Sequence, residues 1–284
     1  MNKLTHLARA FGAIGLLTLH LAAPAIAATH TATAEPSASW ARPTIVLVHG
    51  AFAESANWNE VARGLRARSF PVVAAANPLR GVKSDADYVA AIVAGIQGPV
   101  VLVGHSYGGS VISVAAAQRP NVKALVFVAA FAPDVGESAA ALSSKFPGST
   151  LGPALSAPVP LPGGAKDLYI LQDKFAAQFA ADLPPATAKL MAVSQRPITE
   201  SALNEAAFAA AWKTLPSWFI YGDADKNIPP AAQAFMAGRA KSKKTVVVKG
   251  ASHVVMTSRP RLVTRLILEA ATAATAATAA TVRP

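Results

Sequence analysis

The sequence contains no cysteine among its 284 residues. A disulfide framework, a thiolate nucleophile, an iron–sulfur cluster and cysteine-ligated zinc all need the sulfur atom, so the sequence excludes each of them. Any chemistry must therefore use oxygen or nitrogen atoms. A protein without thiols is also compatible with export into an oxidising compartment.

Acidic residues are scarce, with 15 Asp and Glu against 26 Lys and Arg, and the formal net charge is +11. Such an excess of positive charge first suggests a nucleic acid or an anionic membrane as partner. The basic residues are scattered, however. Their tightest cluster, Lys241, Lys243 and Lys244, has no interleaved aromatic residues on which bases could stack. We therefore expect no nucleic-acid partner.

The first 27 residues have the pattern of a secretory signal peptide. Lys3 and Arg9 are followed by a short apolar run and a small-residue site that ends at Ala27. The run is shorter than the roughly 20 apolar residues of a membrane-spanning helix. We expect cleavage after Ala27, a periplasmic or secreted protein, and no stable membrane insertion once the signal peptide is removed.

Two further segments differ in composition from the centre of the chain. Residues 28–40 are rich in Ala, Thr, Ser and Pro, which favours a linker. Residues 271–284 form a low-complexity tail with an Ala-Ala-Thr repeat. The predicted folded domain is therefore residues 41–270.

Within this domain, short β-branched runs alternate with longer segments of helical periodicity. Runs that are apolar at every position are typical of strands buried on both faces. Their alternation with helices predicts an α/β fold with a mostly parallel central sheet flanked by helices. The predicted strands are residues 44–48, 71–74, 100–103, 124–128, 217–221 and 245–248, and the predicted helices are residues 58–68, 85–97, 107–118, 231–240 and 259–270.

Residues 134–215 interrupt this alternation. They contain no comparable strand, but they hold Phe175 with Phe179 and Phe208 with Trp212, each pair four residues apart as on one helix face. Sites on parallel sheets gather at the carboxyl ends of the strands, so this insertion predicts a helical cap above a site. We expect the cap to set substrate size without taking part in the chemistry, with most of its aromatic side chains packed on the core.

The motif Gly-x-Ser-x-Gly, from Gly104 to Gly108, lies between a predicted strand and a predicted helix. A sharp turn at this point lifts the hydroxyl of Ser106 clear of the sheet, and glycines on either side avoid collisions with the tight backbone. The motif alone occurs often by chance. Its position between strand and helix is what predicts that Ser106 is a nucleophile.

A serine hydroxyl is a poor nucleophile near neutral pH and needs an adjacent base. His253 follows the predicted strand 245–248, in a loop at the active edge, and comes after the serine in chain order. His105 precedes the serine inside the turn and would pack beside the site, whereas His49 would shape a turn. The remaining histidines fall in the signal peptide or linker: His6, His20 and His30.

The acid that orients this base should come between the serine and the histidine. Asp225 follows the predicted strand 217–221 and is our first choice. Asp134, which follows the strand ending at Val128, is second. Asp223 is third, because a turn residue of this type commonly hydrogen-bonds its own backbone.

Charge that develops on an oxygen in the transition state needs backbone donors. One donor in this arrangement is the amide after the nucleophile, that of Tyr107, and the other comes from the loop after the first strand. In that loop Ala51 is the first choice for the oxyanion hole, with Phe52 as the alternative.

With these motifs in view, the sequence resembles the α/β-hydrolase superfamily over about residues 43–268, and within it a bacterial branch close to plant methyl esterases and hydroxynitrile lyases. The resemblance implies the triad Ser106, Asp225 and His253 and an acyl-enzyme route. Hydroxynitrile lyases of that branch carry a lysine where this chain has Val254, which argues against cyanohydrin cleavage. The segments that carry the resemblance are residues 44–52, 77–79, 104–109, 128–134, 222–229 and 250–256.

The sequence therefore predicts a serine carboxylic-ester hydrolase that acts on a small-molecule ester through an acyl-enzyme and requires no metal or organic cofactor. A lactonase or a cofactor-free perhydrolase could use the same triad. A non-catalytic binding protein could keep the same fold, although an intact Ser106, Asp225 and His253 argue against it. An assay with a generic nitrophenyl ester separates the last alternative from the others.

Overall fold

The computed structural model describes residues 42–281. The expected signal peptide and linker lie outside the described residues, as do His6, His20 and His30, so these assignments stay predictions. Every described residue belongs to a single unit of the chain, Ala38–Pro284.

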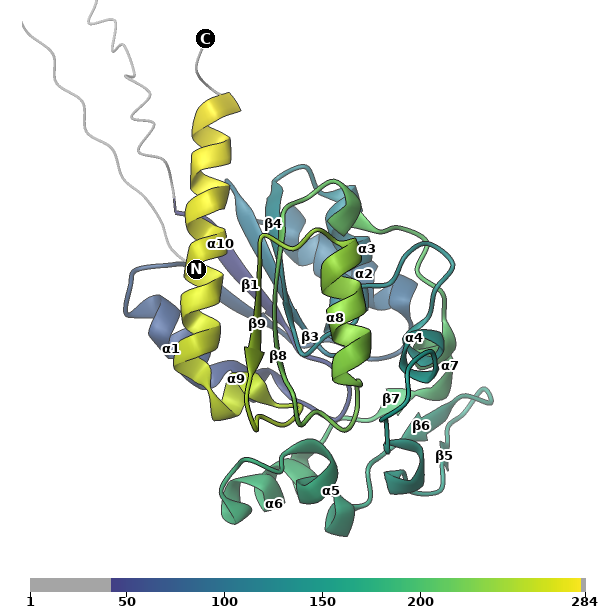
Figure 1. Ribbon diagram of the computed structural model, residues 1–284. Helices are drawn as coiled ribbons and strands as arrows, with labels where there is room; N and C mark the ends of the chain where they lie inside the picture. The colour runs from purple at the N-terminus through teal and green to yellow at the C-terminus, as the bar shows by residue number, and fades with distance from the viewer. Residues whose placement is uncertain (1–41, 282–284) are drawn as a thin grey trace, which may run out of the picture. The chain divides into compact units, whose positions relative to one another are not determined.

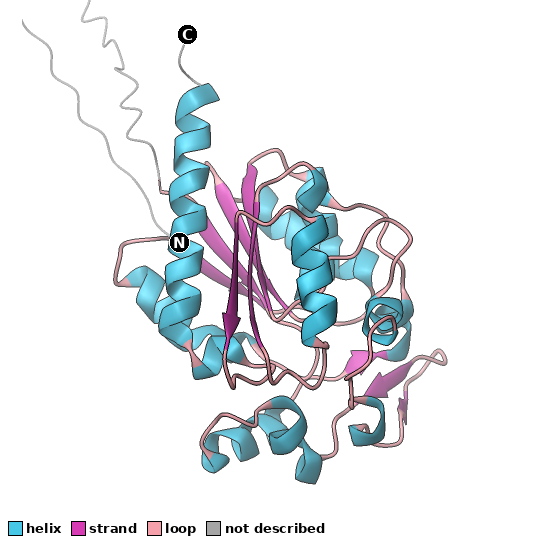
Figure 2. Cartoon of the chain, viewed as in Figure 1, coloured by secondary structure: helices cyan, strands magenta, loops and turns pink. Residues whose placement is uncertain are grey.

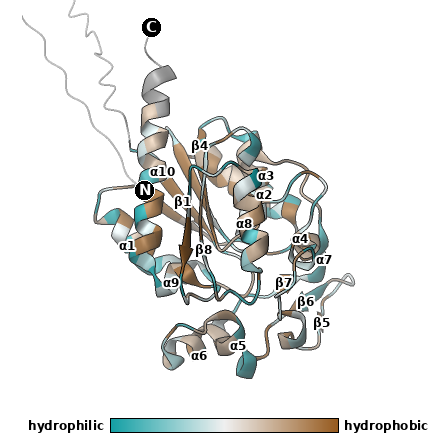
Figure 3. Ribbon diagram, viewed as in Figure 1, coloured by the Kyte–Doolittle hydropathy of each residue, from teal (hydrophilic) through white to brown (hydrophobic). Residues whose placement is uncertain are grey.

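A parallel sheet of six strands forms the centre of this unit (Figure 1). The strands are β1 (Thr44–Val48), β2 (Val72–Ala75), β3 (Val100–His105), β4 (Val122–Val128), β8 (Ser217–Gly222) and β9 (Lys244–Val248). They lie in the order β2-β1-β3-β4-β8-β9, and each neighbouring pair is parallel. In Figure 3 the strands are largely brown, the colour of hydrophobic residues. The central strands are buried on both faces because they are apolar at nearly every position.

Helices cover both faces of the sheet (Figure 2). On one face lie α1 (Asn59–Arg66), which follows a short 3-10 helix η1 (Ser55–Trp58), and α10 (Pro260–Thr281). On the other face lie α2 (Val82–Ala94), α3 (Gly108–Ala115) with η2 (Ala116–Gln118), and α8 (Pro230–Arg239). This arrangement confirms the predicted α/β class with a mostly parallel sheet. No helix within residues 42–281 is both long and apolar enough to cross a membrane.

The last helix, α10, is longer than the sequence predicted. It continues through the Ala/Thr repeat to Thr281, and the side chains of Ala271 and Ala274 are buried. Alanine favours helix and occupies little space, so the first turns of the repeat pack against the domain. A short helix, α9 (Val255–Ser258), connects the predicted base loop to α10.

The insertion before β8 lies at the carboxyl ends of the strands, toward which the β9 arrow points in Figure 1. It contains short strands that the sequence did not predict, and these pair antiparallel in the order β5-β6-β7. Strands of two or three residues are too short to show a period. The cap elements are α4 (Ala139–Ser144), η3 (Gly152–Ala154), β5 (Val159–Pro160), β6 (Lys166–Leu168), α5 (Gln172–Phe179), α6 (Pro185–Ser194), β7 (Ile198–Thr199), α7 (Glu200–Asn204) and η4 (Ala211–Lys213).

One aromatic pair of the cap was predicted correctly and the other was not. Phe175 and Phe179 share helix α5, and their ring centroids lie 4.9 Å apart. Phe208 instead lies in a loop and is half exposed, whereas Trp212 is buried and donates its Nε1–H to the carbonyl of Pro133 at 2.7 Å. Trp212 therefore secures the end of the cap and does not face a ligand.

The loops after β8 and β9 lie in direct contact with each other. The amide of Asp223 donates to the carbonyl of Val248 at 3.2 Å, and the amide of Ala224 donates to that of Ala251 at 3.2 Å. A Cβ on Gly222 would lie only 2.0 Å from the Ala251 oxygen, so this close approach requires glycine. The contact brings the predicted acid loop beside the predicted base loop.

Candidate active site

Ser106 lies at the sharp turn between β3 and α3. Its φ of 54° falls in the left-handed region that non-glycine residues rarely occupy. The turn is close-packed, because a Cβ on Gly104 would lie 2.6 Å from the carbonyl oxygen of Gly108. A Cβ on Gly109 would lie 2.1 Å from that of Phe131. Glycines in the motif and directly after it therefore allow the strained backbone that presents the serine.

His253 and Asp225 form a buried pair. The Nδ1 of His253 lies 2.8 Å from Oδ2 of Asp225, and the two side chains are 1% and 0% exposed. The amides of Asn227 and Ile228 donate to the other carboxylate oxygen at 2.8 and 3.1 Å. The Nε2 of His253 is buried and has no hydrogen-bond partner within the described residues. The ring is therefore held at one nitrogen and free at the other.

The other two candidate acids lie elsewhere. Asp223 accepts a hydrogen bond from the amide of Gly250 at 2.6 Å. It therefore helps to join the loop after β8 to the loop after β9. Asp134 forms an ion pair with Lys213 at 2.5 Å, and this pair lowers the pKa of the carboxyl group. Of the three acids, the structure brings only Asp225 to His253.

Two backbone amides near Ser106 make no hydrogen bond within the described chain, those of Ala51 and Tyr107. The amide of Phe52, the alternative donor, is occupied because it donates to the carbonyl of Arg196 in the cap at 2.9 Å. A Cβ on Gly50 would lie 2.5 Å from the Cβ of Ser106 and 3.0 Å from the nitrogen of Tyr107. The first loop therefore lies directly against the serine turn.

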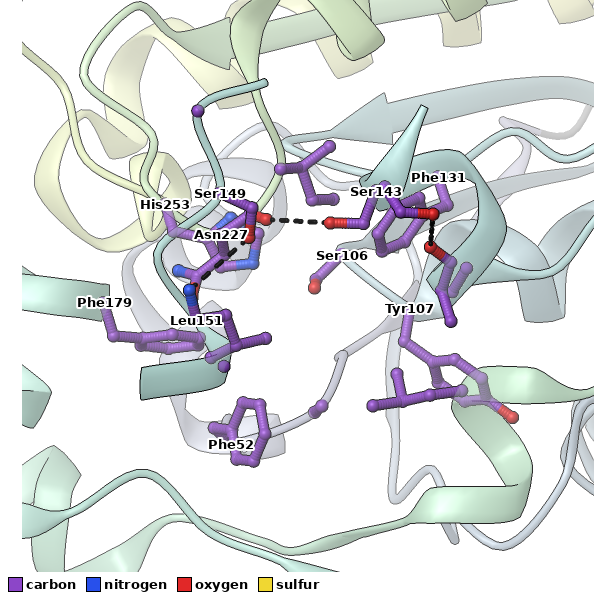
Figure 4. A pocket seen from close by; sticks show the side chains of 18 of the residues that line it. Phe52, Ser106, Tyr107, Phe131, Ser143, Ser149, Leu151, Phe179, Asn227 and His253 are labelled. Carbon is purple, nitrogen blue, oxygen red and sulfur yellow. Dashed lines mark hydrogen bonds between the residues drawn. The ribbon is translucent and has the colours of Figure 1, made fainter. Parts of the chain in front are cut away.

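Ser106, His253, Ala51 and Tyr107 line one cavity of about 490 Å³. Figure 4 shows the hydroxyl of Ser106 pointing into this cavity. Within the described residues, no hydrogen bond joins Ser106 to His253.

The cavity wall is mostly apolar and contains no Asp, Glu, Lys or Arg. Its aromatic and aliphatic side chains come from both the core domain and the cap. Four serine or asparagine side chains of the cap and the acid loop add hydroxyl and amide groups. The wall includes Phe52, Phe131, Phe146, Leu151, Leu155, Phe179, Leu203 and Ile228, with Ser143, Ser144, Ser149 and Asn227 as polar members in addition to Ser106 and His253.

The two remaining described histidines support the site and do not replace His253. His105 is fully buried, its ring centroid lies 4.8 Å from that of His253, and burial lowers its pKa well below the usual value. His49 accepts a hydrogen bond at Nε2 from the amide of Asn77 at 3.0 Å. Asn77 donates its Nδ2–H back to the carbonyl of His49 at 2.9 Å, which fixes the loop after β1.

Sequence reasoning missed two polar residues that contact the site residues from outside the cavity. Gln233 on α8 donates its Nε2–H to Oδ2 of Asp225 at 2.9 Å. Asp85 on α2 accepts a hydrogen bond from the hydroxyl of Tyr107 at 2.9 Å, and burial raises the pKa of its carboxyl group. No local sequence pattern predicts either contact, because each joins side chains from separate segments that meet only in the folded protein.

A family model described as "Alpha/beta hydrolase family" matches residues 45–266. The chain belongs to this family. The match confirms the superfamily predicted from the serine turn and its flanking motifs. No curated protein sequence matches the chain.

Several solved structures resemble this alpha/beta hydrolase. Polyneuridine aldehyde esterase is 21% identical with a TM-score of 0.70, over 80% of this chain and 98% of that one. An extracellular alpha/beta-hydrolase from a Paenibacillus species is 23% identical with a TM-score of 0.63, over 80% and 98%. A pyrethroid hydrolase from Sphingobium faniae is 23% identical with a TM-score of 0.63, over 81% and 97%. At these identities the likeness shows the shared fold.

Burial of His49 predicts a loss of stability in mild acid. Desolvation, the largest cause, holds its pKa at about 4 in the folded protein, against 6.5 ordinarily. Below pH 6.5, His49 binds a proton in the unfolded chain, whereas in the folded protein it stays neutral until about pH 4. The free energy of unfolding therefore falls as the pH falls from 6.5 to 4. Between pH 7 and 4.5 we expect His49 alone to cost about 2 kcal/mol of unfolding free energy.

Urea unfolding of the wild type and of His49→Gln at both pH values measures this contribution. The glutamine does not titrate and retains an acceptor for the amide of Asn77. The variant should lose about 2 kcal/mol less than the wild type between pH 7 and 4.5. Equal losses in the two proteins would contradict the assignment.

Proposed function

We propose that this alpha/beta hydrolase is a serine carboxylic-ester hydrolase that acts through an acyl-enzyme. The observation that carries the proposal is the buried pair of His253 and Asp225, in which the imidazole Nε2 has no partner within the described residues. His253 lines the same cavity as the strained Ser106. A base that is oriented by a carboxylate and lies beside a serine is the arrangement that activates a hydroxyl for attack.

In the first half of the reaction, Ser106 Oγ attacks the ester carbonyl carbon while His253 Nε2 accepts the hydroxyl proton. The imidazole becomes positively charged, and the carboxylate of Asp225 stabilises it through Nδ1–H. The amides of Ala51 and Tyr107 are the proposed donors to the negatively charged oxygen of the tetrahedral intermediate. Collapse of this intermediate breaks the bond to the alcohol, which leaves with the proton from Nε2.

The second half releases the acid. A water molecule donates a proton to His253 Nε2 and attacks the acyl carbon, and the same two amides again stabilise the oxygen anion. Breaking of the bond to Ser106 Oγ frees the carboxylic acid, and the proton on Nε2 returns to the serine. Each step needs only side chains, backbone amides and water.

The cavity wall favours a neutral and largely apolar ester. Four phenylalanine rings line the cavity and no charged side chain does, so an ionised substrate group would be desolvated without a partner. Two of the solved structures that resemble this chain are an esterase and a pyrethroid hydrolase. On the N-terminal pattern of residues 1–27 we also propose a periplasmic or secreted protein.

Replacement of Ser106 tests the nucleophile directly. Ser106→Ala should reduce kcat for nitrophenyl acetate about 10⁴- to 10⁶-fold, as in other triads that lose their nucleophile. Ser110→Ala is the matched control, because Ser110 lies one turn further along α3 and does not line the cavity. The control should retain the wild-type rate. Hydrolysis by Ser106→Ala at the wild-type rate would rule out the proposed nucleophile.

A matched pair of substrates tests the uncharged cavity. We expect kcat/KM for a nitrophenyl ester of a straight-chain acid to exceed that for an analogue of equal length ending in a carboxylate by at least about 100-fold. The reason is that an unpaired carboxylate loses several kcal/mol of solvation when it is buried. The comparison uses steady-state rates at pH 7. A preference for the anionic ester would show that the acyl group lies outside this cavity.

A further inference from the structure

Cap helix α5 reaches the proposed catalytic acid through its penultimate residue. Gln178 is buried, and its Nε2 donates to the carbonyl of Lys226 at 2.9 Å and to Oδ1 of Asn227 at 3.1 Å. Asn227 returns a hydrogen bond from Nδ2 to the carbonyl of Gln178 at 3.3 Å. The amide of Asn227 donates to Asp225 at 2.8 Å. Asn227 therefore links Gln178 of the cap to the carboxylate of Asp225 through hydrogen bonds.

The next turn of the cap contacts the base loop. The ring centroid of Phe179 lies 5.0 Å from that of His253. Asp182 accepts a hydrogen bond from Oγ of Ser252, the residue before the histidine, at 2.5 Å. Asp182 also lies 3.5 Å from the guanidinium of Arg259, beyond α9. Three residues of the cap segment 178–182 therefore contact the loops that carry the acid and the base.

These contacts are directional, which apolar packing is not. Thr150 donates its hydroxyl to Oε1 of Gln178 at 2.8 Å, so the amide group has partners at both its oxygen and its nitrogen. Breaking one such buried hydrogen bond leaves a polar group unsatisfied, which costs more than the bond contributes when it is formed. Gln178 does not line the cavity. Its buried amide therefore orients the acid loop and does not contact substrate.

We propose that Gln178 and Asp182 are positioning residues, through which the cap holds Asp225 and His253 in register. The inference rests on the proposed function, and it revises the expectation that the cap only sets substrate size. Asp225 and His253 lie on separate loops, and the cap segment 178–182 contacts both. A small displacement of either loop lengthens the hydrogen bond between them and misorients Nε2.

Identical substitutions at two glutamines of α5 test this role. Gln178→Leu removes the donors to the acid loop, whereas Gln172→Leu makes the same change at an exposed position of the same helix. With nitrophenyl acetate, which is too small to need the cavity walls, Gln178→Leu should lower kcat about 10- to 100-fold, since misplacement by about 1 Å costs up to 10²-fold. KM should change little, and Gln172→Leu should match the wild type.

The proton on Nδ1 of His253 gives a readout that does not depend on turnover. Its NMR resonance should shift or broaden in Gln178→Leu and in Asp182→Ala, and remain unchanged in Gln172→Leu, with thermal unfolding measured alongside. If Gln178→Leu does not fold, Asp182→Ala decides. Wild-type kcat and an unchanged resonance in the folded variants would overturn the positioning role while leaving ester hydrolysis intact. A wild type without esterase activity would instead overturn the proposed function, and the resonance would still test the positioning.

Discussion

The site depends on a carboxylate that is kept fully buried. Asp225 is shielded from water, and a charge in that position is tolerated only when hydrogen-bond donors replace the lost solvent. Four donors surround it: the imidazole Nδ1 of His253, the side chain of Gln233, and the amides of Asn227 and Ile228. These donors come from three separate segments, so the arrangement of the loops around the acid follows from the need to stabilise one charge.

The serine turn imposes a second constraint, which is steric. The turn at Ser106 packs so closely against its surroundings that a Cβ on Gly50, Gly108 or Gly109 would lie within 2.6 Å of another atom. This proximity puts the amides of Ala51 and Tyr107 beside the serine without any dedicated side chain. The cap contacts the same loop, because the carbonyl of Arg196 accepts a hydrogen bond from the amide of Phe52, whereas the amide of Ala51 makes none within the described chain.

The sequence predicted the central sheet well because its strands are short runs of mostly β-branched, aliphatic or aromatic residues. The predicted strand ends differ by at most two residues from those in the structure. It also singled out Ser106, Asp225 and His253, since each follows a strand at the same sheet edge. The short strands β5 to β7 were missed because they show no period. Gln178 and Asp182 were missed for another reason, as they bond to residues 48 and 70 positions away.

Covalent labelling tests most directly whether a buried acid and base activate Ser106. A fluorophosphonate should add to the wild-type protein on one peptide, the one that contains Ser106, as mapped by mass spectrometry. Asp225→Asn should slow the labelling by at least about 100-fold, by analogy with other triads, while Asp223→Asn should label at nearly the wild-type rate. An adduct on another residue, or an Asp225→Asn variant labelled as fast as the wild type, would contradict the account.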